Sequence, residues 1–301
     1  MTPMNTKKYC PAKLDWLASV LLATGLLCSN AFAGDSFKDI KAKAEQGDAA
    51  AQFELGYIYY SGGSVAKDYA EAVKWCRKSA EQGYLLAQFS LGYMYHNGEG
   101  VEKDYSEALK WYRKASDQND AAAQFNLGGM YLNGKGVAKD YSEAVKWYRK
   151  SAEQGNNLAQ ASLGFAYHNG EGVDKDYAEA VKWYRKSAEQ GNNFAQLSLG
   201  LAYLNGEGVE KDYAEAVKWF RKAADQNNAT AQFSIGVMYE HGLGIDKDYL
   251  EAYAWYNISA KNVTNAAEHR DELEKKMSSQ QVAQAQKRTK ELRAMIDGVK
   301  K

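Results

Sequence analysis

The sequence predicts an all-α fold, a right-handed superhelical α-solenoid of paired antiparallel helices. One motif recurs every 36 residues, and its tryptophans stand at Trp75, Trp111, Trp147, Trp183, Trp219 and Trp255. Both prolines lie within the first dozen residues, so the rest of the chain lacks the residue that most strongly interrupts helices. Helix pairs this short bury their apolar faces by stacking on further copies, and stacked copies make a solenoid.

The composition is that of an ordinary soluble globular protein. The 301 residues carry 38 Lys and Arg against 38 Asp and Glu, so the formal net charge is zero. A balanced charge creates no field that would attract nucleic acid or an anionic membrane surface. We therefore expect no nucleic-acid partner.

Residues 1–33 have the layout of a cleavable secretory signal peptide. Three lysines precede an apolar stretch from Trp16 to Cys28, and the triplet Ala31-Phe32-Ala33 offers a cleavage site after Ala33. The apolar stretch is shorter than the roughly 20 residues that cross a bilayer, so we expect no stable membrane insertion. This pattern predicts a periplasmic or secreted protein, and an uncleaved anchor is the less favoured alternative.

The cysteines favour neither a lipoprotein nor a disulfide-stabilised protein. Lipoprotein processing at Cys28 is disfavoured because Leu26 and Leu27 precede it, where small residues are required. Removal of the signal peptide also removes Cys10 and Cys28, which leaves Cys76 without a partner for an internal disulfide. The stability of the mature chain must therefore come from packing.

Each repeat is expected to contain two helices. The first opens near Asp48 and places Ala51, Leu55 and Tyr59 on one buried stripe, while Gly56 beside it lets the neighbouring helix approach closely. A turn such as 97–100, Asn-Gly-Glu-Gly, then leads to the second helix.

The second helix carries clear start and stop signals. Asp68 can accept from the first-turn amides while Glu71, three residues later, reaches back to the cap amide. The helix runs through Trp75 and stops at Gly83, which tolerates a left-handed conformation. The tryptophan series is explained more economically by packing between repeats than by a ligand platform.

These signals divide the chain into four parts. A signal peptide (1–33) precedes an N-terminal half-repeat (34–47), six repeats (48–263) and a C-terminal segment (264–301). The last segment is expected to form two capping helices, Ala266–Met277 and Gln280–Asp297, with its apolar side chains covering the last repeat. The expected covering side chains are Val282, Ala285, Leu292 and Ile296.

Several motifs resemble a known repeat family. Ala-Gln-x-x-Leu-Gly-x-x-Tyr, Asn-Gly-x-Gly-Val, Lys-Asp-Tyr-x-Glu-Ala and Lys-Trp-Tyr-Arg-Lys-x-Ala, within about residues 44–263, closely resemble the Sel-1-like repeat (SLR) family, a branch of the tetratricopeptide superfamily. The resemblance implies an adaptor that assembles protein complexes without chemistry. For exported bacterial members it also implies envelope function or host-cell contact.

The sequence offers only weak catalytic and metal-binding candidates, and we expect no enzyme activity, metal or cofactor. Residues 64–67 match Ser-x-x-Lys of penicillin-recognising enzymes, but neither Lys-Thr-Gly nor Ser-Asp-Asn accompanies them. His96 and His168 stand two repeats apart, roughly 20 Å, which is too far for one zinc ion. A cell-wall protein that binds or hydrolyses peptidoglycan or β-lactams is the alternative function. The relatives associated with penicillin binding carry a disulfide in each repeat, whereas Cys76 stands alone.

Positions that vary between repeats while staying on one helical face indicate where a partner binds. On the first helix they match Ala50, Phe53, Tyr57 and Tyr60, which share one stripe. The resemblance to tetratricopeptide repeats implies that this stripe lines a concave groove, and its aromatic anchors suit a protein or peptide partner. The predicted contact residues are Phe53, Tyr57, Tyr60, Phe89, Tyr93, His96, Phe125, Leu132, Phe165, His168, Leu201, Leu204, Val237 and Glu240. For the phenylalanines, packing between first helices is an equally favoured alternative, and the partner's identity and the oligomeric state stay open.

Overall fold

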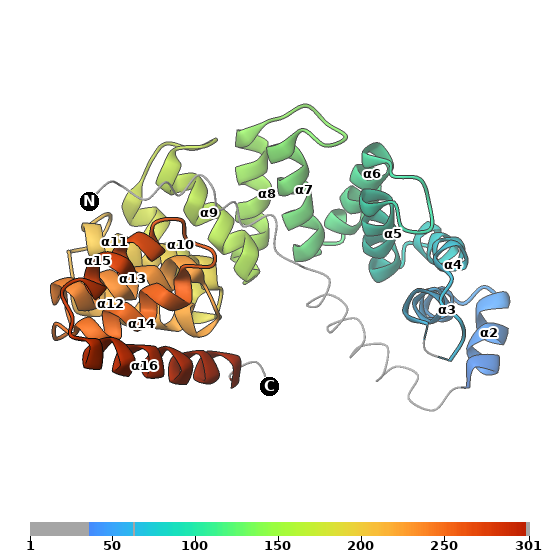
Figure 1. Cartoon of the computed structure of the whole chain (residues 1–301). Helices are drawn as coiled ribbons and strands as arrows, with labels where there is room; N and C mark the ends of the chain where they lie inside the picture. Colours follow the sequence, from blue (N-terminus) through green and yellow to red (C-terminus); the bar gives the residue numbers. More distant parts are fainter. Residues whose placement is uncertain (1–35, 63, 299–301) are drawn as a thin grey trace. The chain divides into compact units, whose positions relative to one another are not determined.

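The computed structural model describes residues 36–62 and 64–298, which form fifteen helices and, within those ranges, no strand (Figure 1). The predicted all-α fold of repeated helical hairpins is confirmed. The predicted signal peptide lies outside the described residues, and no helix among those described is long and apolar enough to cross a bilayer. The chain divides into two compact units between Ala159 and Gln160, here called the N-terminal and C-terminal units.

Both units are built from alternating first and second helices of the repeats. The N-terminal unit contains α2 (Phe37–Glu45), α3 (Ala49–Ser61), α4 (Tyr69–Glu81), α5 (Leu85–Asn97), α6 (Tyr105–Asp117), α7 (Ala121–Asn133) and α8 (Tyr141–Glu153). Helix α9 (Asn157–Asn169) contains the boundary. The C-terminal unit contains α10 (Tyr177–Glu189), α11 (Asn193–Asn205), α12 (Tyr213–Asp225), α13 (Ala229–His241), α14 (Tyr249–Ser259), α15 (Ala266–Glu274) and α16 (Ser279–Gly298).

The second helices begin and end at the predicted signals, with one difference. Asp68 Oδ1 accepts from the amides of Ala70 and Glu71, both at 3.0 Å, and Gly83 after the helix has φ +90°. The expected return of Glu71 to the cap amide is wrong. Its carboxylate accepts from Lys74 Nζ at 2.8 Å and from Trp75 Nε1 at 3.1 Å, so it fixes the indole instead.

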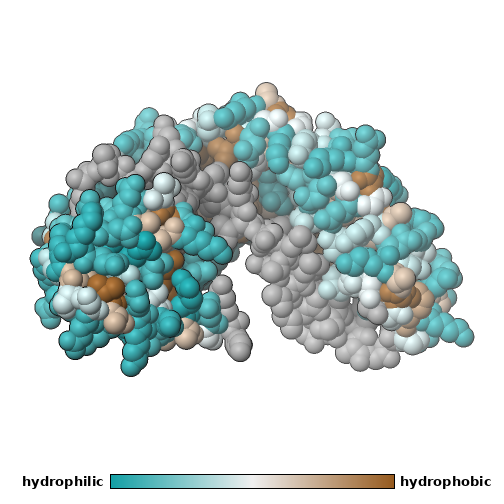
Figure 2. Space-filling view, in the orientation of Figure 1, coloured by the Kyte–Doolittle hydropathy of each residue, from teal (hydrophilic) through white to brown (hydrophobic). Residues whose placement is uncertain are grey.

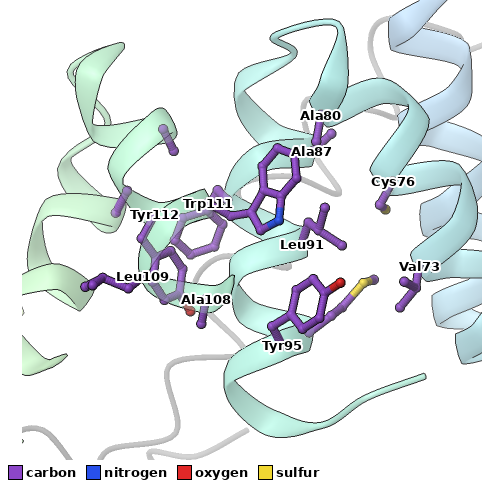
Figure 3. Close-up of a cluster of buried hydrophobic side chains, with 14 of the residues drawn as sticks. Val73, Cys76, Ala80, Ala87, Leu91, Tyr95, Ala108, Leu109, Trp111 and Tyr112 are labelled. Atoms are coloured by element: carbon purple, nitrogen blue, oxygen red, sulfur yellow. The ribbon is translucent and has the colours of Figure 1, made fainter. Parts of the chain in front are cut away.

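The core of each repeat forms where a glycine of the first helix meets the second helix. A Cβ added to Gly92 would lie 2.8 Å from Cδ1 of Tyr112, so only glycine permits this approach. Trp111 lies beside Ala87 and Leu91 in the same cluster, and all three are buried (Figure 3). The tryptophans therefore serve packing, as predicted.

Side-chain amides and guanidinium groups fix consecutive repeats in register. Gln118 Nε2 donates to Gln88 Oε1 and to the carbonyl of Gly83, both at 2.8 Å. Arg113 Nη2 donates to Tyr131 Oη at 2.7 Å, from a second helix to the next first helix. Because both partners of each bond recur in sequence, the same connection forms again at Gln226 and Arg221 in the C-terminal unit.

The last two helices differ from the repeats and pack on the final hairpin. Helix α15 ends at Glu274, before the expected Met277, and α16 lies against α14. Leu292 and Ile296 are buried there, and Arg288 Nε donates to Glu251 Oε1 at 2.5 Å. These contacts cover apolar side chains that would otherwise face solvent at the end of the stack.

Candidate functional site

The predicted contact residues separate into buried and half-buried side chains. Phe53, Phe89 and Phe125 are only 2%, 4% and 7% exposed. The Phe89 ring lies 5.6 Å from the ring of Tyr112 on the second helix, and the Phe125 ring lies 5.7 Å from that of Tyr148. The expectation that these phenylalanines contact a partner is therefore wrong. Phe89 and Phe125 pack on the second helix of their own hairpin, whereas Phe53 packs on Tyr84 at the start of the next first helix, closer to the alternative of packing between first helices.

The remaining predicted residues are half-buried and form a row in each unit. The N-terminal row consists of Tyr57, Tyr60, Tyr93, His96 and Leu132, and the C-terminal row consists of Phe165, His168, Leu201, Leu204 and Val237. Among the described residues the large apolar residues that count as exposed are Tyr69, Tyr141 and Met295, and the view in Figure 2 shows a mostly hydrophilic surface with small apolar spots. The rows therefore consist mainly of apolar and aromatic side chains that remain partly open to solvent.

In three repeats, the row residue nearest the end of the first helix contacts the tyrosine that begins the second helix of the same repeat. The rings of Tyr60 and Tyr69 lie 5.2 Å apart, as do those of His96 and Tyr105. In the C-terminal unit, the rings of His168 and Tyr177 lie 5.1 Å apart. Such ring pairs hold the row side chains in fixed orientations.

The glycine turn of the next repeat lies directly over this point. A Cβ added to Gly100, which has φ +69°, would lie 2.0 Å from the carbonyl oxygen of Tyr69. Glu99, which precedes this glycine, therefore lies next to the row residues of the preceding repeat. Tyr60 Oη donates to Glu99 Oε2 at 2.7 Å, and burial together with Glu99 raises the pKa of Tyr60.

The equivalent contact between the next two repeats of the N-terminal unit has a different chemistry. Lys135 Nζ lies 3.3 Å from His96 Nε2 and 5.0 Å from the ring centre of Tyr105. Burial, and then the charges of Lys135 and Lys103, lower the pKa of His96 to about 4. The imidazole is therefore neutral near pH 7, and its Nε2 accepts from the ammonium group.

Glu240 does not belong to an open contact surface, which corrects its predicted role. Tyr256 Oη donates to Glu240 Oε2 at 2.7 Å, and Lys276 Nζ lies 3.6 Å from Oε1. His269 Nδ1 lies 3.8 Å from Oε2. Tyr256 belongs to α14, whereas His269 lies on α15 and Lys276 follows it, so Glu240 connects the segment after the last repeat to that repeat.

Two surface hollows lie away from the rows. One, of about 490 Å³, lies along α10 and includes Trp183 and Val209, and the other, of about 520 Å³, includes Trp147 and Gln124. In the second, Gln154 Nε2 donates to Gln124 Oε1 at 2.7 Å, so these two amides of the lining pair with each other. Neither hollow contains a residue of the rows.

The lysine of the Ser-x-x-Lys motif contacts an aromatic side chain. Lys67 Nζ lies 3.4 Å from Tyr69 Oη and 5.4 Å from its ring centre, so the lysine of the Ser-x-x-Lys motif points to this tyrosine. Within the described residues, no group of three or more His, Cys, Asp or Glu side chains could hold a metal ion.

Sequence comparison between repeats missed the turn residues that complete each row. They lie at a single position between two constant glycines, and their identities are Glu99, Lys135, Glu171, Glu207 and Leu243. This variation between constant neighbours is the signal that could have identified them. The contact itself could not be foreseen, because it joins residues of different repeats.

Comparison with known proteins identifies the repeat. The family model described as Sel1 repeat matches residues 49–84, 85–120, 121–156, 157–192, 193–228 and 229–262, more than half of the chain. Antigen c5321, a protective antigen present in uropathogenic Escherichia coli strains, has an SLR fold and is 40% identical with a TM-score of 0.79. The similarity covers 84% of this chain and 55% of that chain. A Sel1 repeat protein of Oxalobacter formigenes is 37% identical with a TM-score of 0.67, over 81% of this chain and 95% of that chain.

A shorter similarity links the chain to EsiB, the secretory immunoglobulin A-binding protein of Escherichia coli. The two are 43% identical over 44 residues, which is 15% of this chain and 9% of EsiB. The chain thus spans only a small part of EsiB and about half of antigen c5321. The six matched repeats and the related solved structures show that this chain belongs to the Sel1 repeat family.

Proposed function

We propose that this protein is an exported, non-enzymatic scaffold that binds a protein or peptide along its rows of half-buried side chains. Sel1 repeat proteins are of the protein–protein interaction scaffold type, which supports the general role. Export rests on the signal-peptide pattern of residues 1–33.

The proposal rests on the positions at which the repeats differ in sequence. Scaffold positions such as Leu55 and Leu91 are fully buried and nearly constant. The half-buried positions beside them change from Tyr57 and Tyr93 to Phe165 and then to leucine and valine, yet stay apolar wherever they carry a side chain. A surface that needed only solubility would accept charged residues at such positions, whereas a contact surface favours apolar and aromatic ones.

The relatives support a role at the bacterial surface or toward a host. EsiB binds secretory immunoglobulin A, and antigen c5321 is a protective antigen of uropathogenic strains. The host-facing role proposed for this protein rests on those two names together with the export pattern.

The test is affinity capture from envelope extracts and from host secretions with the mature chain as bait. We expect Tyr57→Ala with Tyr93→Ala, or Phe165→Ala alone, to reduce recovery of the bound protein at least about tenfold, the loss of about 1.4 kcal/mol. Lys146→Ala, an exposed change on a second helix, is the control and should leave recovery unchanged. If the row variants keep the helical circular dichroism signal and retain all interactors, the binding surface lies elsewhere.

The alternative of a cell-wall or β-lactam-acting protein makes the opposite prediction. A fluorescent penicillin would label the mature chain covalently, and Ser64→Ala would abolish this labelling. Under the scaffold proposal the wild-type chain stays unlabelled.

A further inference from the structure

We propose that the N-terminal row binds a peptide segment through an acidic side chain that pairs with Lys135 beside His96, with an apolar neighbour of that side chain packed on Tyr93. This inference rests on the proposed function and adds the chemistry of the ligand. It concerns the N-terminal unit alone.

Lys135 is a half-buried cation whose contacts are all uncharged. In the described part of the chain these contacts are His96 Nε2 at 3.3 Å and the Tyr105 ring at 5.0 Å. Partial burial of an ammonium group costs free energy that a carboxylate partner would recover, and the carboxylate would also receive a charge-assisted hydrogen bond. The site is thus complementary to an anion.

The equivalent turn residue of the preceding repeat, Glu99, pairs with a side chain of the protein itself. There Glu99 accepts from Tyr60 at 2.7 Å, so the donor and the acceptor both belong to the protein. Lys135 stands where other repeats carry Glu99, Glu171, Glu207 and Leu243, and it is the one basic residue in this set. The charge at this contact is therefore reversed, and because the contacts of Lys135 within the described residues are uncharged, a carboxylate of a bound peptide would balance it.

The N-terminal row also indicates which peptide residue lies near the acidic one. Tyr93 and His96 are three residues apart on α5, so their side chains lie about 5–6 Å apart on one face. Because Lys135 Nζ lies 3.3 Å from His96 Nε2, a carboxylate on Lys135 lies near His96. Alternate residues of an extended peptide lie about 6.6–6.8 Å apart on one face, which is close to the spacing between Tyr93 and His96. We therefore expect an Asp or Glu two positions from an aromatic or aliphatic residue.

A displayed library of random nine-residue peptides, selected on the immobilised mature chain, tests this pairing. The variant Lys135→Glu introduces the residue that three other turns carry, and Lys139→Glu makes the same charge change in the same turn but outside the row. We expect wild-type selection to enrich the acidic–x–apolar pattern. The Kd of a selected peptide, measured by fluorescence polarisation, should rise at least about tenfold for Lys135→Glu and less than about twofold for Lys139→Glu.

Changes in the peptide provide a second arm that does not depend on folding of a variant. Replacing the acidic residue of the peptide with Gln should weaken binding to the wild-type chain at least about tenfold. Replacing it with Lys should produce a peptide that prefers Lys135→Glu over wild type.

Two failures are distinguishable. If selected peptides bind and lose affinity on Tyr93→Ala but show no acidic preference, or if Lys135→Glu behaves as Lys139→Glu does, this inference is overturned and the proposed function stands. If no selected peptide loses affinity on the combined Tyr57→Ala and Tyr93→Ala changes, the proposed function of the row is overturned as well.

Discussion

Replacing Gly100 with alanine tests whether the turn of one repeat truly bears on the helix start of the preceding one. The new Cβ would lie 2.0 Å from the carbonyl oxygen of Tyr69 and 2.3 Å from its carbonyl carbon. These are backbone atoms, so no side-chain rotation relieves the overlap and the turn must move away. Gly83→Ala is the matched control, because Gly83 also has a positive φ, +90°, but nothing lies within 4 Å of its added Cβ.

The difference between the two variants isolates the contact between repeats. A positive φ costs an L-residue about 1–2 kcal/mol, which both variants incur. Overlap with a fixed neighbour adds about 1–3 kcal/mol. We therefore expect the free energy of unfolding to fall by about 1–2 kcal/mol for Gly83→Ala and by about 2–5 kcal/mol for Gly100→Ala.

Urea denaturation followed by circular dichroism at 222 nm and by tryptophan fluorescence measures these losses. Two probes are needed because repeat arrays can unfold in parts, and non-coincident transitions would show that a single free energy does not apply. Equal losses in the two variants would refute the reasoning, since the clash with Tyr69 would then contribute nothing.

Two further predictions concern the row and the core. The pKa of His96 is lowered to about 4 in the folded chain, so as pH falls the unfolded chain binds a proton at this histidine first. The contribution of His96 to the free energy of unfolding is therefore complete above about pH 6.5 and declines toward pH 4. The full shift corresponds to about 3 kcal/mol, which solvent at the partly exposed ring reduces to about 1–2 kcal/mol. His96→Leu should flatten this pH dependence in urea titrations, and an unchanged slope would contradict the assignment. Phe89→Ala should cost about 3–5 kcal/mol because the ring is buried against Tyr112, whereas Phe89→Leu should cost about 1–2 kcal/mol. A loss below 1 kcal/mol for alanine would instead indicate a surface ring.

Local rules explain why the repeat helices could be located from sequence, and also where that reasoning failed. Asp68 caps the first amides of α4, and Gly83 takes the left-handed conformation after it, as any helix of this pattern would. Glu71 does not return to the cap amide because Trp75, one turn later on the same helix, offers its carboxylate a partly buried indole donor, so one local contact replaces another.

The candidate site was predicted only in part because its burial depends on contacts between helices. Helical spacing places Phe89 and Tyr93 on one stripe, but it cannot tell which edge of that stripe the next helix covers. The structure buries Phe89 against Tyr112 and leaves Tyr93 half-buried. Glu240 was assigned to the row by its place on the helical stripe, but His269 and Lys276 lie beyond the last repeat, so their contacts with it have no counterpart to compare.

The sequence by itself determined the repeat, the helix boundaries and the buried glycine contacts, because caps, turns and periodicity act over a few residues of one chain segment. Only the tertiary structure decided which aromatic side chains stay open to solvent and that Lys135 meets His96. Those two side chains belong to different repeats, and their meeting depends on how closely one turn packs over the helix before it, which no local pattern specifies.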